Sequence, residues 1–402
     1  MSNGTPSVYI LYTGGTIGSG GSPLAPLPPS EFAALIASQP GFTDSTVTVQ
    51  LEDDEDFTIN YTLGAFDPPL DSSSITPEDW ITIAQDLLNN YDGYNGLVVL
   101  HGTDTMAFTA SMLSFLLDGL SKPVVVTGSQ LPLQQTRNDA LRNLVTSIVI
   151  AATEQVPEAM LFFNLDLMRG NRSAKVNASE FPAFGSPNFP PLGQAGIDID
   201  INESLILPPP TGNTLDDPGN RQQLSLQLES FRVAFQNFSV ASLLLFPGIQ
   251  ASTVEAILSD TTPPILGLII QAFGSGNAPA NPELINALKT AHDEGVVLVD
   301  VTQVLAGSVD LDAYESASGL KAAGAISGYD MTPEAALTKL IYLSSLWAGD
   351  QTTIEMLMTQ DLRGELTSSV QELADRRWAL LAASRGPSRL YLKAVRIAEH
   401  GA

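Results

Sequence analysis

Apolar residues in the first half of the chain gather in short runs of strand length, and segments with helical spacing separate these runs. The clearest runs lie at residues 8–12, 97–100, 124–126 and 161–163. Runs that are apolar throughout, in alternation with helices, are typical of parallel strands buried between two layers of helices. We therefore predict an α/β fold, in which a larger N-terminal domain has a mostly parallel sheet with helices on both faces.

Thr76 marks the start of a helix in this half. Pro77 follows with a backbone φ that already suits a helix, and Asp79 places a negative charge in the first turn. Trp80 and Leu87 continue the apolar pattern at helical spacing. We expect a helix from Pro77 onward.

The second half repeats the alternation over a shorter stretch. Mostly apolar runs of strand length lie at 240–246, 265–270 and 296–300. Asn281 and Pro282 are typical of a helix start, and Gly295 is typical of a helix end. The pattern predicts a smaller C-terminal domain with its own parallel sheet.

Composition changes between the two halves and again near the end of the chain. Residues 208–223 are rich in Pro, Gly, Asn and Asp and have no apolar period, which is typical of a linker. We therefore predict an N-terminal domain at 1–208, a linker at 209–228, a C-terminal domain at 229–368 and a tail at 369–402.

The predicted tail differs from the rest of the chain in its charge. Its apolar residues recur at helical spacing, so we expect a basic helical tail, either solvated or docked on an acidic surface. The charged residues from position 370 onward are Arg376, Arg377, Arg385, Arg389, Lys393 and Arg396, against Glu372, Asp375 and Glu399.

The chain has 402 residues, of which 44% are hydrophobic, and this is enough to form two cores. No apolar run approaches the roughly 18 residues of a membrane span. Residues 1–7 lack the basic and apolar stretches of a secretion signal. We expect a cytoplasmic protein without a membrane partner.

Charge and composition also narrow the chemistry. A formal net charge of −26 repels phosphate backbones, so we expect no nucleic acid partner. Cys is absent, which excludes disulfides, thiolate metal ligands and a Cys nucleophile, and the presence of only three His residues argues against a His-rich metal centre. We predict that the protein uses no metal or other cofactor, and that any hydrolysis relies on hydroxyl, carboxylate, Lys or Tyr groups.

The first predicted strand runs directly into Thr13-Gly14-Gly15-Thr16-Ile17-Gly18. In open α/β sheets, ligands bind beyond the carboxyl ends of the strands. Neither of the glycine-rich nucleotide-binding motifs fits these residues. Taken alone, the segment is as consistent with a structural turn as with a ligand-binding loop.

A second strand end carries His101-Gly102-Thr103-Asp104-Thr105. Two strand ends that each present a small hydroxyl would suit a nucleophile and a helper group, although a Thr or Asp here could equally cap the next helix.

Lys175 lies in a neutral stretch. A lysine can serve as a general base in a desolvated setting, but most lysines are surface charges.

Asp71-Ser72-Ser73 precedes the predicted helix start at Thr76. Its hydroxyl and backbone N–H groups would suit a carboxylate ligand. A polar turn explains the same residues.

Taken together, several motifs resemble the L-asparaginase family, in its cytosolic bacterial branch, over about residues 6–368. The motifs are TGGTIG at 13–18, DSS at 71–73, HGTDTM at 101–106, TGSQLP at 127–132, RGNRSAK at 169–175, GSGNAP at 274–279, DMTPEAALTKL at 330–340 and LRGELT at 362–367.

The resemblance implies hydrolysis of L-asparagine to L-aspartate and ammonia. Thr16 would be the nucleophile that forms an aspartyl ester, and Thr103, Asp104 and Lys175 would form the second catalytic group, with Lys175 as the base partner of Thr103. Asp104 would also bind the substrate α-ammonium. The α-carboxylate would bind at 71–73, which is Asp71, Ser72 and Ser73, and mainly at Ser72.

The resemblance further implies a homotetramer or homodimer in which the second domain of one subunit covers the site of its neighbour. Asn277, in the GSGNAP turn, is a candidate for that contribution, although it could be an ordinary turn residue.

The chain departs from the family pattern at three positions. Leu24 stands nearest the place where many relatives carry a loop tyrosine, and Gln271 and Val304 stand where some cytosolic relatives carry an effector-binding Arg and Cys. Two other readings therefore stay open: a related amidohydrolase with glutaminase activity, and an amino-acid sensor that does not turn over its ligand.

Overall fold

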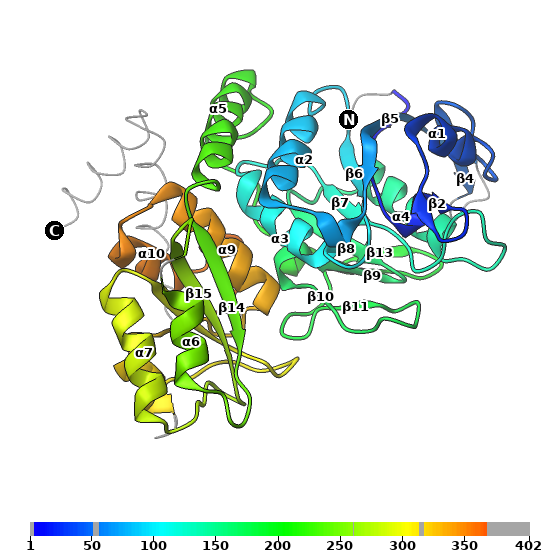
Figure 1. The fold of residues 1–402 in the computed structure, drawn as a ribbon. Helices are drawn as coiled ribbons and strands as arrows, with labels where there is room; N and C mark the ends of the chain where they lie inside the picture. Colours follow the sequence, from blue (N-terminus) through cyan, green and yellow to red (C-terminus); the bar gives the residue numbers. More distant parts are fainter. Residues whose placement is uncertain (1–3, 51–55, 260, 313–316, 368–402) are drawn as a thin grey trace. The chain divides into compact units, whose positions relative to one another are not determined.

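The computed structural model describes residues 4–50, 56–259, 261–312 and 317–367, and it divides into two units between Leu228 and Glu229. Figure 1 shows both units, which are described separately below. The predicted basic tail at 369–402 lies outside the described residues.

The first unit contains a nine-stranded sheet in the order β13-β12-β9-β8-β7-β6-β1-β5-β4. Its strands are β1 Ser7–Gly14, β4 Thr46–Gln50, β5 Asp56–Leu70, β6 Gly96–Leu100, β7 Val124–Thr127, β8 Ala159–Phe163, β9 Asp166–Arg169, β12 Gly193–Ala195 and β13 Ile199–Ile201. Strands β8, β7, β6, β1 and β5 are parallel, whereas the pairs toward both edges are antiparallel. The prediction of a mostly parallel sheet is confirmed for these central strands, and antiparallel strands extend the sheet at both edges.

Two short hairpins lie outside this sheet. They are β2 Ser19–Gly20 with β3 Ala25–Pro26, and β10 Ala174–Lys175 with β11 Phe184–Gly185.

Helices cover both faces of the large sheet, as predicted (Figure 1). They are α1 Pro29–Ala37, α2 Pro77–Asn89, α3 Met106–Leu116 and α4 Ala140–Thr153. Alternate β1 residues such as Ile10 and Tyr12 pack with α1 and α4, and the intervening Tyr9 and Leu11 are buried on the other face, where α3 packs against β7 and β8. Burial on both faces explains why these strands are apolar throughout.

The helix predicted from Pro77 is confirmed as α2. Thr76 and Asp79 form a reciprocal capping box, in which Asp79 Oδ2 lies 2.7 Å from both the backbone nitrogen and the hydroxyl oxygen of Thr76. Further along, Pro218–Ala234 form α5, so the stretch predicted as linker is helical in its second half.

The second unit has a four-stranded sheet, β14-β15-β16-β17, in which every pair is parallel. The strands are β14 Ser239–Leu244, β15 Ile265–Ala272, β16 Val297–Thr302 and β17 Ile326–Ser327, and the helices are α6 Ala251–Leu258, α7 Pro282–Asp293, α8 Ser318–Ala322, α9 Pro333–Leu346 and α10 Gln351–Met358. The smaller parallel-sheet domain is confirmed. Its core includes Leu268, Ile270 and Leu298.

A buried ion pair holds the end of the described chain against α9. Lys339 Nζ lies 2.6 Å from Glu365 Oε1, and both side chains are fully buried. Lys339 also donates to the carbonyl oxygens of Met358 and Gln360, so one ammonium fixes the end of α10 and two points of the segment after it.

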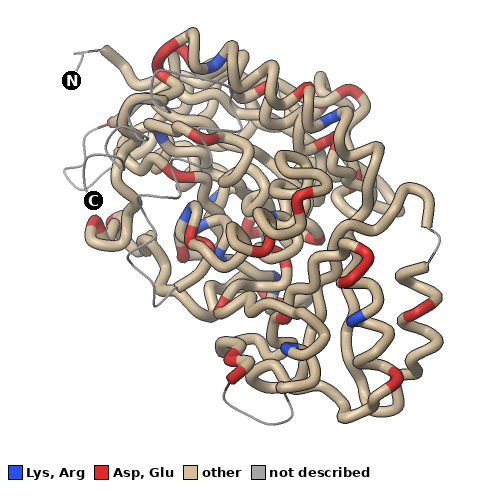
Figure 2. The backbone as a smooth tube through the Cα atoms, turned by 90° about the vertical axis from the view of Figure 1, so that its left-hand side faces the viewer, with Lys and Arg blue, Asp and Glu red and all other residues tan. Residues whose placement is uncertain are grey.

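Acidic residues are spread over most elements and basic residues are sparse, as Figure 2 shows. Across residues 4–367, wherever the structure describes them, no helix is both long and apolar enough to span a bilayer.

Candidate active site

The order of the parallel strands places the candidate site between β1 and β6. After β1 the chain forms β5 on one side, and it then crosses to form β6 on the other side of β1. Such a switch in direction opens a crevice beyond the carboxyl ends of the two strands, and ligands bind there in open α/β sheets. Residues 13–18 and 101–105 follow these two strands.

Three turns meet at Gly102 in this crevice. The Thr13 hydroxyl donates to the carbonyl oxygen of Leu100 at 2.9 Å, which joins the ends of β1 and β6. A Cβ atom on Gly15 would lie 2.4 Å from the Gly102 nitrogen, and one on Gly102 would lie 2.3 Å from Ser72 Oγ. Only glycine permits this approach at positions 15 and 102, so these two glycines set the spacing of the three turns.

The turn after β5 holds its own residues in place. Asp71 Oδ1 accepts hydrogen bonds from the backbone nitrogen and the hydroxyl of Ser73, both at 2.9 Å. The Thr105 hydroxyl donates to the carbonyl oxygen of Ser72 at 2.7 Å, which ties this turn to the second strand end. Asp71 and Ser73 are exposed, whereas Ser72 is buried with its Oγ against Gly102.

Lys175 joins the second strand end from the β10–β11 hairpin. Its Nζ donates to Thr103 Oγ1 at 2.9 Å and to Asp104 Oδ1 at 2.7 Å. Thr103 is buried, the Lys175 side chain is 23% exposed, and the Asp104 side chain is 63% exposed. The three side chains therefore form one cluster, with the carboxylate on its open side.

Thr16 lies in the short 3-10 helix Thr16–Gly18, directly after β1. Its side chain is partly exposed, and in the described parts of the chain its hydroxyl has no hydrogen-bond partner. The backbone nitrogen of Leu133 donates to the carbonyl oxygen of Ile17 at 3.1 Å and steadies the turn. The structure thus places Thr16 beside the same crevice but leaves its hydroxyl unbonded to Thr103 and Lys175.

The β2–β3 hairpin contains Leu24, one of the positions where the sequence departs from the family pattern. Leu24, near its tip, is 52% exposed and offers no hydroxyl. The phenol of buried Tyr12 lies at the base of this hairpin, 3.3 Å from the carbonyl oxygens of Gly18 and Leu27. Burial raises the pKa of Tyr12, which keeps the phenol neutral, so its role is to hold the hairpin.

His101 has a positioning role that sequence reasoning missed. Its Nδ1 lies 2.7 Å from the Gly102 carbonyl oxygen, which can only accept, so Nδ1 carries the proton. Nε2 then accepts from the Thr109 hydroxyl at 2.9 Å, and Thr109 accepts from Trp80 Nε1 at 3.0 Å. Burial lowers the pKa of His101 to about 4, so the ring is neutral and fixes the peptide before Thr103.

Asp139 is a second positioning residue that the sequence did not mark. Its carboxylate accepts from the backbone nitrogens of Gln130 and Leu131 at 3.0 Å each, and it is buried. These bonds shape the TGSQLP turn, and Leu133, the next residue, donates its backbone N–H to the carbonyl oxygen of Ile17 in the Thr16 turn.

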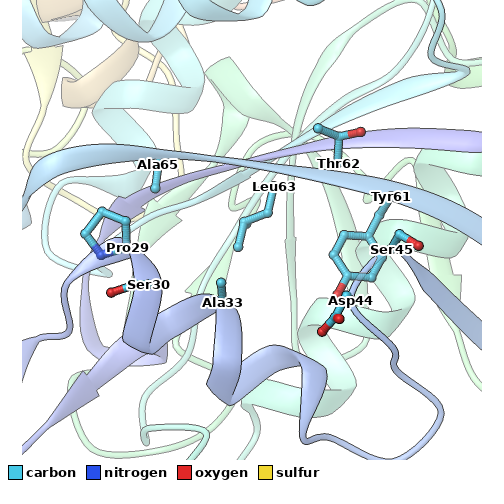
Figure 3. A pocket seen from close by; sticks show the side chains of 9 residues that line it. All are labelled: Pro29, Ser30, Ala33, Asp44, Ser45, Tyr61, Thr62, Leu63 and Ala65. Atoms are coloured by element: carbon cyan, nitrogen blue, oxygen red, sulfur yellow. The ribbon is translucent and has the colours of Figure 1, made fainter.

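A hollow elsewhere in this unit contains none of the predicted site residues. It lies between α1 and β5, with Ala33 and Leu63 facing each other and Asp44 at one end (Figure 3), and its volume is about 540 Å³. Among the residues that the structure describes, no group of three or more His, Cys, Asp and Glu side chains is arranged to hold a metal ion.

The chain matches known proteins along most of its length. Residues 7–207 match the family model for the asparaginase N-terminal domain, and residues 239–358 match that for the glutaminase/asparaginase C-terminal domain. L-asparaginase 1 of Escherichia coli is 42% identical over 362 residues, which cover 90% of this chain and 98% of that protein. The chain belongs to the asparaginase family.

Two further proteins match about the same share of this chain. The crystal structure of L-asparaginase I from Vibrio cholerae superimposes with a TM-score of 0.74 at 41% identity, over 90% of this chain and all of that one. The 60 kDa lysophospholipase of Homo sapiens is 39% identical over 91% of this chain and 62% of its own length. The two matched asparaginase domains fall within the two units of the structure.

Proposed function

We propose that this protein is an L-asparaginase, which hydrolyses L-asparagine to L-aspartate and ammonia. Membership of the asparaginase family and the high coverage of relatives named L-asparaginase support this activity. The contact of Lys175 with Thr103 and Asp104, beside the Thr16 turn at the sheet's switch point, carries the proposal.

The substrate is a zwitterion, and its two charged groups need opposite partners. Asp104 presents an accessible carboxylate for the α-ammonium, while Ser72 and the N–H groups of its turn suit the α-carboxylate. An ammonium bound at Asp104 competes with Lys175 for that carboxylate.

In the first half-reaction, Thr16 Oγ attacks the carbonyl carbon of the substrate's side-chain amide. A carbon–oxygen bond forms, the carbon–nitrogen bond breaks, and the product is an aspartyl ester on Thr16. The Thr16 proton leaves to a base, and the departing nitrogen takes up a proton to become ammonia. In the second half-reaction, water attacks the ester carbon, which releases aspartate and restores the Thr16 hydroxyl.

The Lys175–Thr103 pair supplies the proton transfers in this proposal. Lys175 accepts a proton from Thr103, and Thr103 relays one between the amine and the reacting groups, at the 2.9 Å spacing that such transfer needs. Leu24 cannot assist, because a leucine has no proton to exchange.

Assembly and location are part of the same proposal. We propose a cytoplasmic homotetramer or homodimer in which the Phe273–Asn277 turn of one subunit completes the site of another. A cover of this kind would exclude water from the reacting amide until the ester has formed.

Ammonia release from L-asparagine by the purified protein tests the activity, with L-glutamine assayed in parallel. Release from asparagine that is lost in Thr16→Ala is the expected result. Binding of asparagine without any ammonia release would instead favour the sensor.

A further inference from the structure

Asp300 is an acidic residue in the interior of the second unit. It lies on β16 and has no exposed surface. Neither carboxyl oxygen has a hydrogen-bond partner in the part of the chain that the structure describes. A buried carboxyl without a partner is rare and costly, so its surroundings carry information.

The neighbours of Asp300 on the sheet offer it no charge and no free donor. In register, Asp300 lies between Ile270 of β15 and Ser327 of β17. The Ser327 hydroxyl already donates to the carbonyl oxygen of Val309 and accepts from the backbone nitrogen of Tyr329. Burial raises the pKa of Asp300 to about 7, so the group changes charge near neutrality.

The Phe273–Asn277 turn covers the Asp300 carboxyl. A Cβ atom on Gly276, whose φ is +105°, would lie 2.7 Å from Asp300 Oδ2, so the turn backbone rests directly on the carboxyl. The turn is closed by bonds from Phe273 N to Asn277 O at 2.9 Å and from Asn277 N to Phe273 O at 2.8 Å.

One further bond links this turn to the next segment. The Asp310 backbone nitrogen donates to the carbonyl oxygen of Ser275 at 3.0 Å. The Asp310 carboxylate is exposed and accepts from the Asp312 nitrogen, so it does not face Asp300. The side of the carboxyl that faces the turn is therefore closed by a loop rather than by a strand of the sheet.

We propose that Asp300 is a positioning residue for the asparaginase reaction, which as a neutral acid supports the Phe273–Asn277 turn and on ionisation displaces it together with Asn277. The inference rests on the proposed function, in which Asn277 completes the site of a neighbouring subunit. An ionised carboxylate needs water or a donor. The strands beside it are held by ladder bonds, so the turn is the cover that moves.

The test compares Asp300→Asn with the wild-type enzyme, because the two side chains have nearly the same shape and only the acid ionises. KM and kcat for asparagine are measured from about pH 5.5 to about pH 9, a range that brackets the Asp300 transition. We expect the wild-type KM to rise several-fold above neutrality while kcat changes less. The KM of Asp300→Asn should stay at its low-pH value.

Asp310→Asn is the matched control, since it removes an exposed acid from the adjoining segment. Its KM should follow the wild-type profile. Hydrogen exchange of the turn amides, corrected for the intrinsic pH dependence, should quicken above neutrality in the wild type and not in Asp300→Asn. An alkaline rise in KM that persists in Asp300→Asn overturns the proposal.

Two more variants separate this inference from the proposed function. Gly276→Ala places a methyl group against Asp300 and should raise KM at every pH. Asn277→Ala should raise KM as well. If Asn277→Ala leaves KM unchanged, the shared site fails and the positioning role fails with it. If instead Asn277→Ala raises KM but Asp300→Asn behaves as wild type, only the role of Asp300 is wrong.

Discussion

The Lys175 ammonium nitrogen lies 2.9 Å from the Thr103 hydroxyl oxygen, across 72 residues of sequence. No second lysine or arginine is hydrogen-bonded to Thr103 within the described residues. This hydroxyl therefore depends on one amine for proton exchange.

Replacement of Lys175 by methionine should lower kcat by at least about 10²-fold, the low end for loss of a general base. Thr103→Val should have a similar effect, because it removes the other half of the pair. Steady-state kinetics measure both. Lys289→Met is the control, since Lys289 pairs with Asp293 on the exposed face of α7. Wild-type turnover in Lys175→Met would remove the proposed base.

Thr16→Ala should abolish ammonia release and still bind aspartate. The groups proposed to hold the α-ammonium and α-carboxylate lie on other turns, and the Thr16 hydroxyl supports no hydrogen bond in the described structure. Calorimetric titration with aspartate checks the binding. Thr16→Ser retains a hydroxyl and should keep part of the activity. A Thr16→Ala enzyme with normal turnover contradicts the nucleophile assignment.

A mixture of Thr16→Ala, which should be inactive, with Asn277→Ala, which should have a raised KM, should gain activity at low asparagine concentration if each site draws on two subunits. In a hybrid dimer with one Thr16→Ala subunit and one Asn277→Ala subunit, one site carries both changes and the other carries neither. Random exchange of subunits between equal amounts should restore about a quarter of the wild-type sites. Ammonia release before and after exchange measures this, and light scattering reports the assembly. Activity that never recovers would place Asn277 outside a shared site.

Asp300 should also make stability depend on pH. Its pKa is raised from 3.8 to about 7 by burial, so on raising the pH the unfolded chain loses this proton first. The free energy of unfolding therefore falls between about pH 4 and pH 7, by at most about 4 kcal/mol. Above pH 7 the contribution of Asp300 is constant. Urea unfolding at several pH values should give Asp300→Asn a smaller decline. An identical decline in both proteins would mean that Asp300 is solvated.

Removal of one partner of the Lys339–Glu365 pair should destabilise the second unit. Glu365→Leu leaves the buried Lys339 charge without this carboxylate, which costs about 3–5 kcal/mol. The double variant Lys339→Met with Glu365→Leu should recover much of that loss. Denaturant unfolding of the four proteins completes the cycle, and equal losses in single and double variants would argue against the pair.

The central strands and the helix starts were predictable because local physics determines them. Strands buried on both faces must be apolar throughout, and Thr76 and Pro77 fix a helix start by themselves. The short antiparallel edge was not predictable, because β12 and β13 contain polar Gln194 and Asp200 and no apolar run.

The helix α5 was missed for a different reason. Pro, Gly and Asp residues before it are typical of a linker, yet Leu224, Leu228 and Phe231 recur at helical spacing and are buried. A longer window would have found this stripe.

The site was predictable only in part from its residues. Thr103 could be placed at a strand end, but nothing around Lys175 indicates that a two-residue strand would direct it there. That expectation came from the family motifs. The isolation of Asp300 has no sequence signal at all, since the residue sits inside an otherwise ordinary apolar run.

The meeting of three turns at Gly102 has a consequence for substrate choice. Because the turns of Thr16 and Ser72 each pack against Gly102, the distance between the proposed nucleophile and the proposed α-carboxylate partner should not stretch to suit a longer substrate. Glutamine, held by the same α-groups, would present its amide carbon beyond Thr16, and a misplacement of about 1 Å can slow a reaction about 10²-fold. Discrimination against glutamine should therefore appear as a low kcat rather than as weak binding.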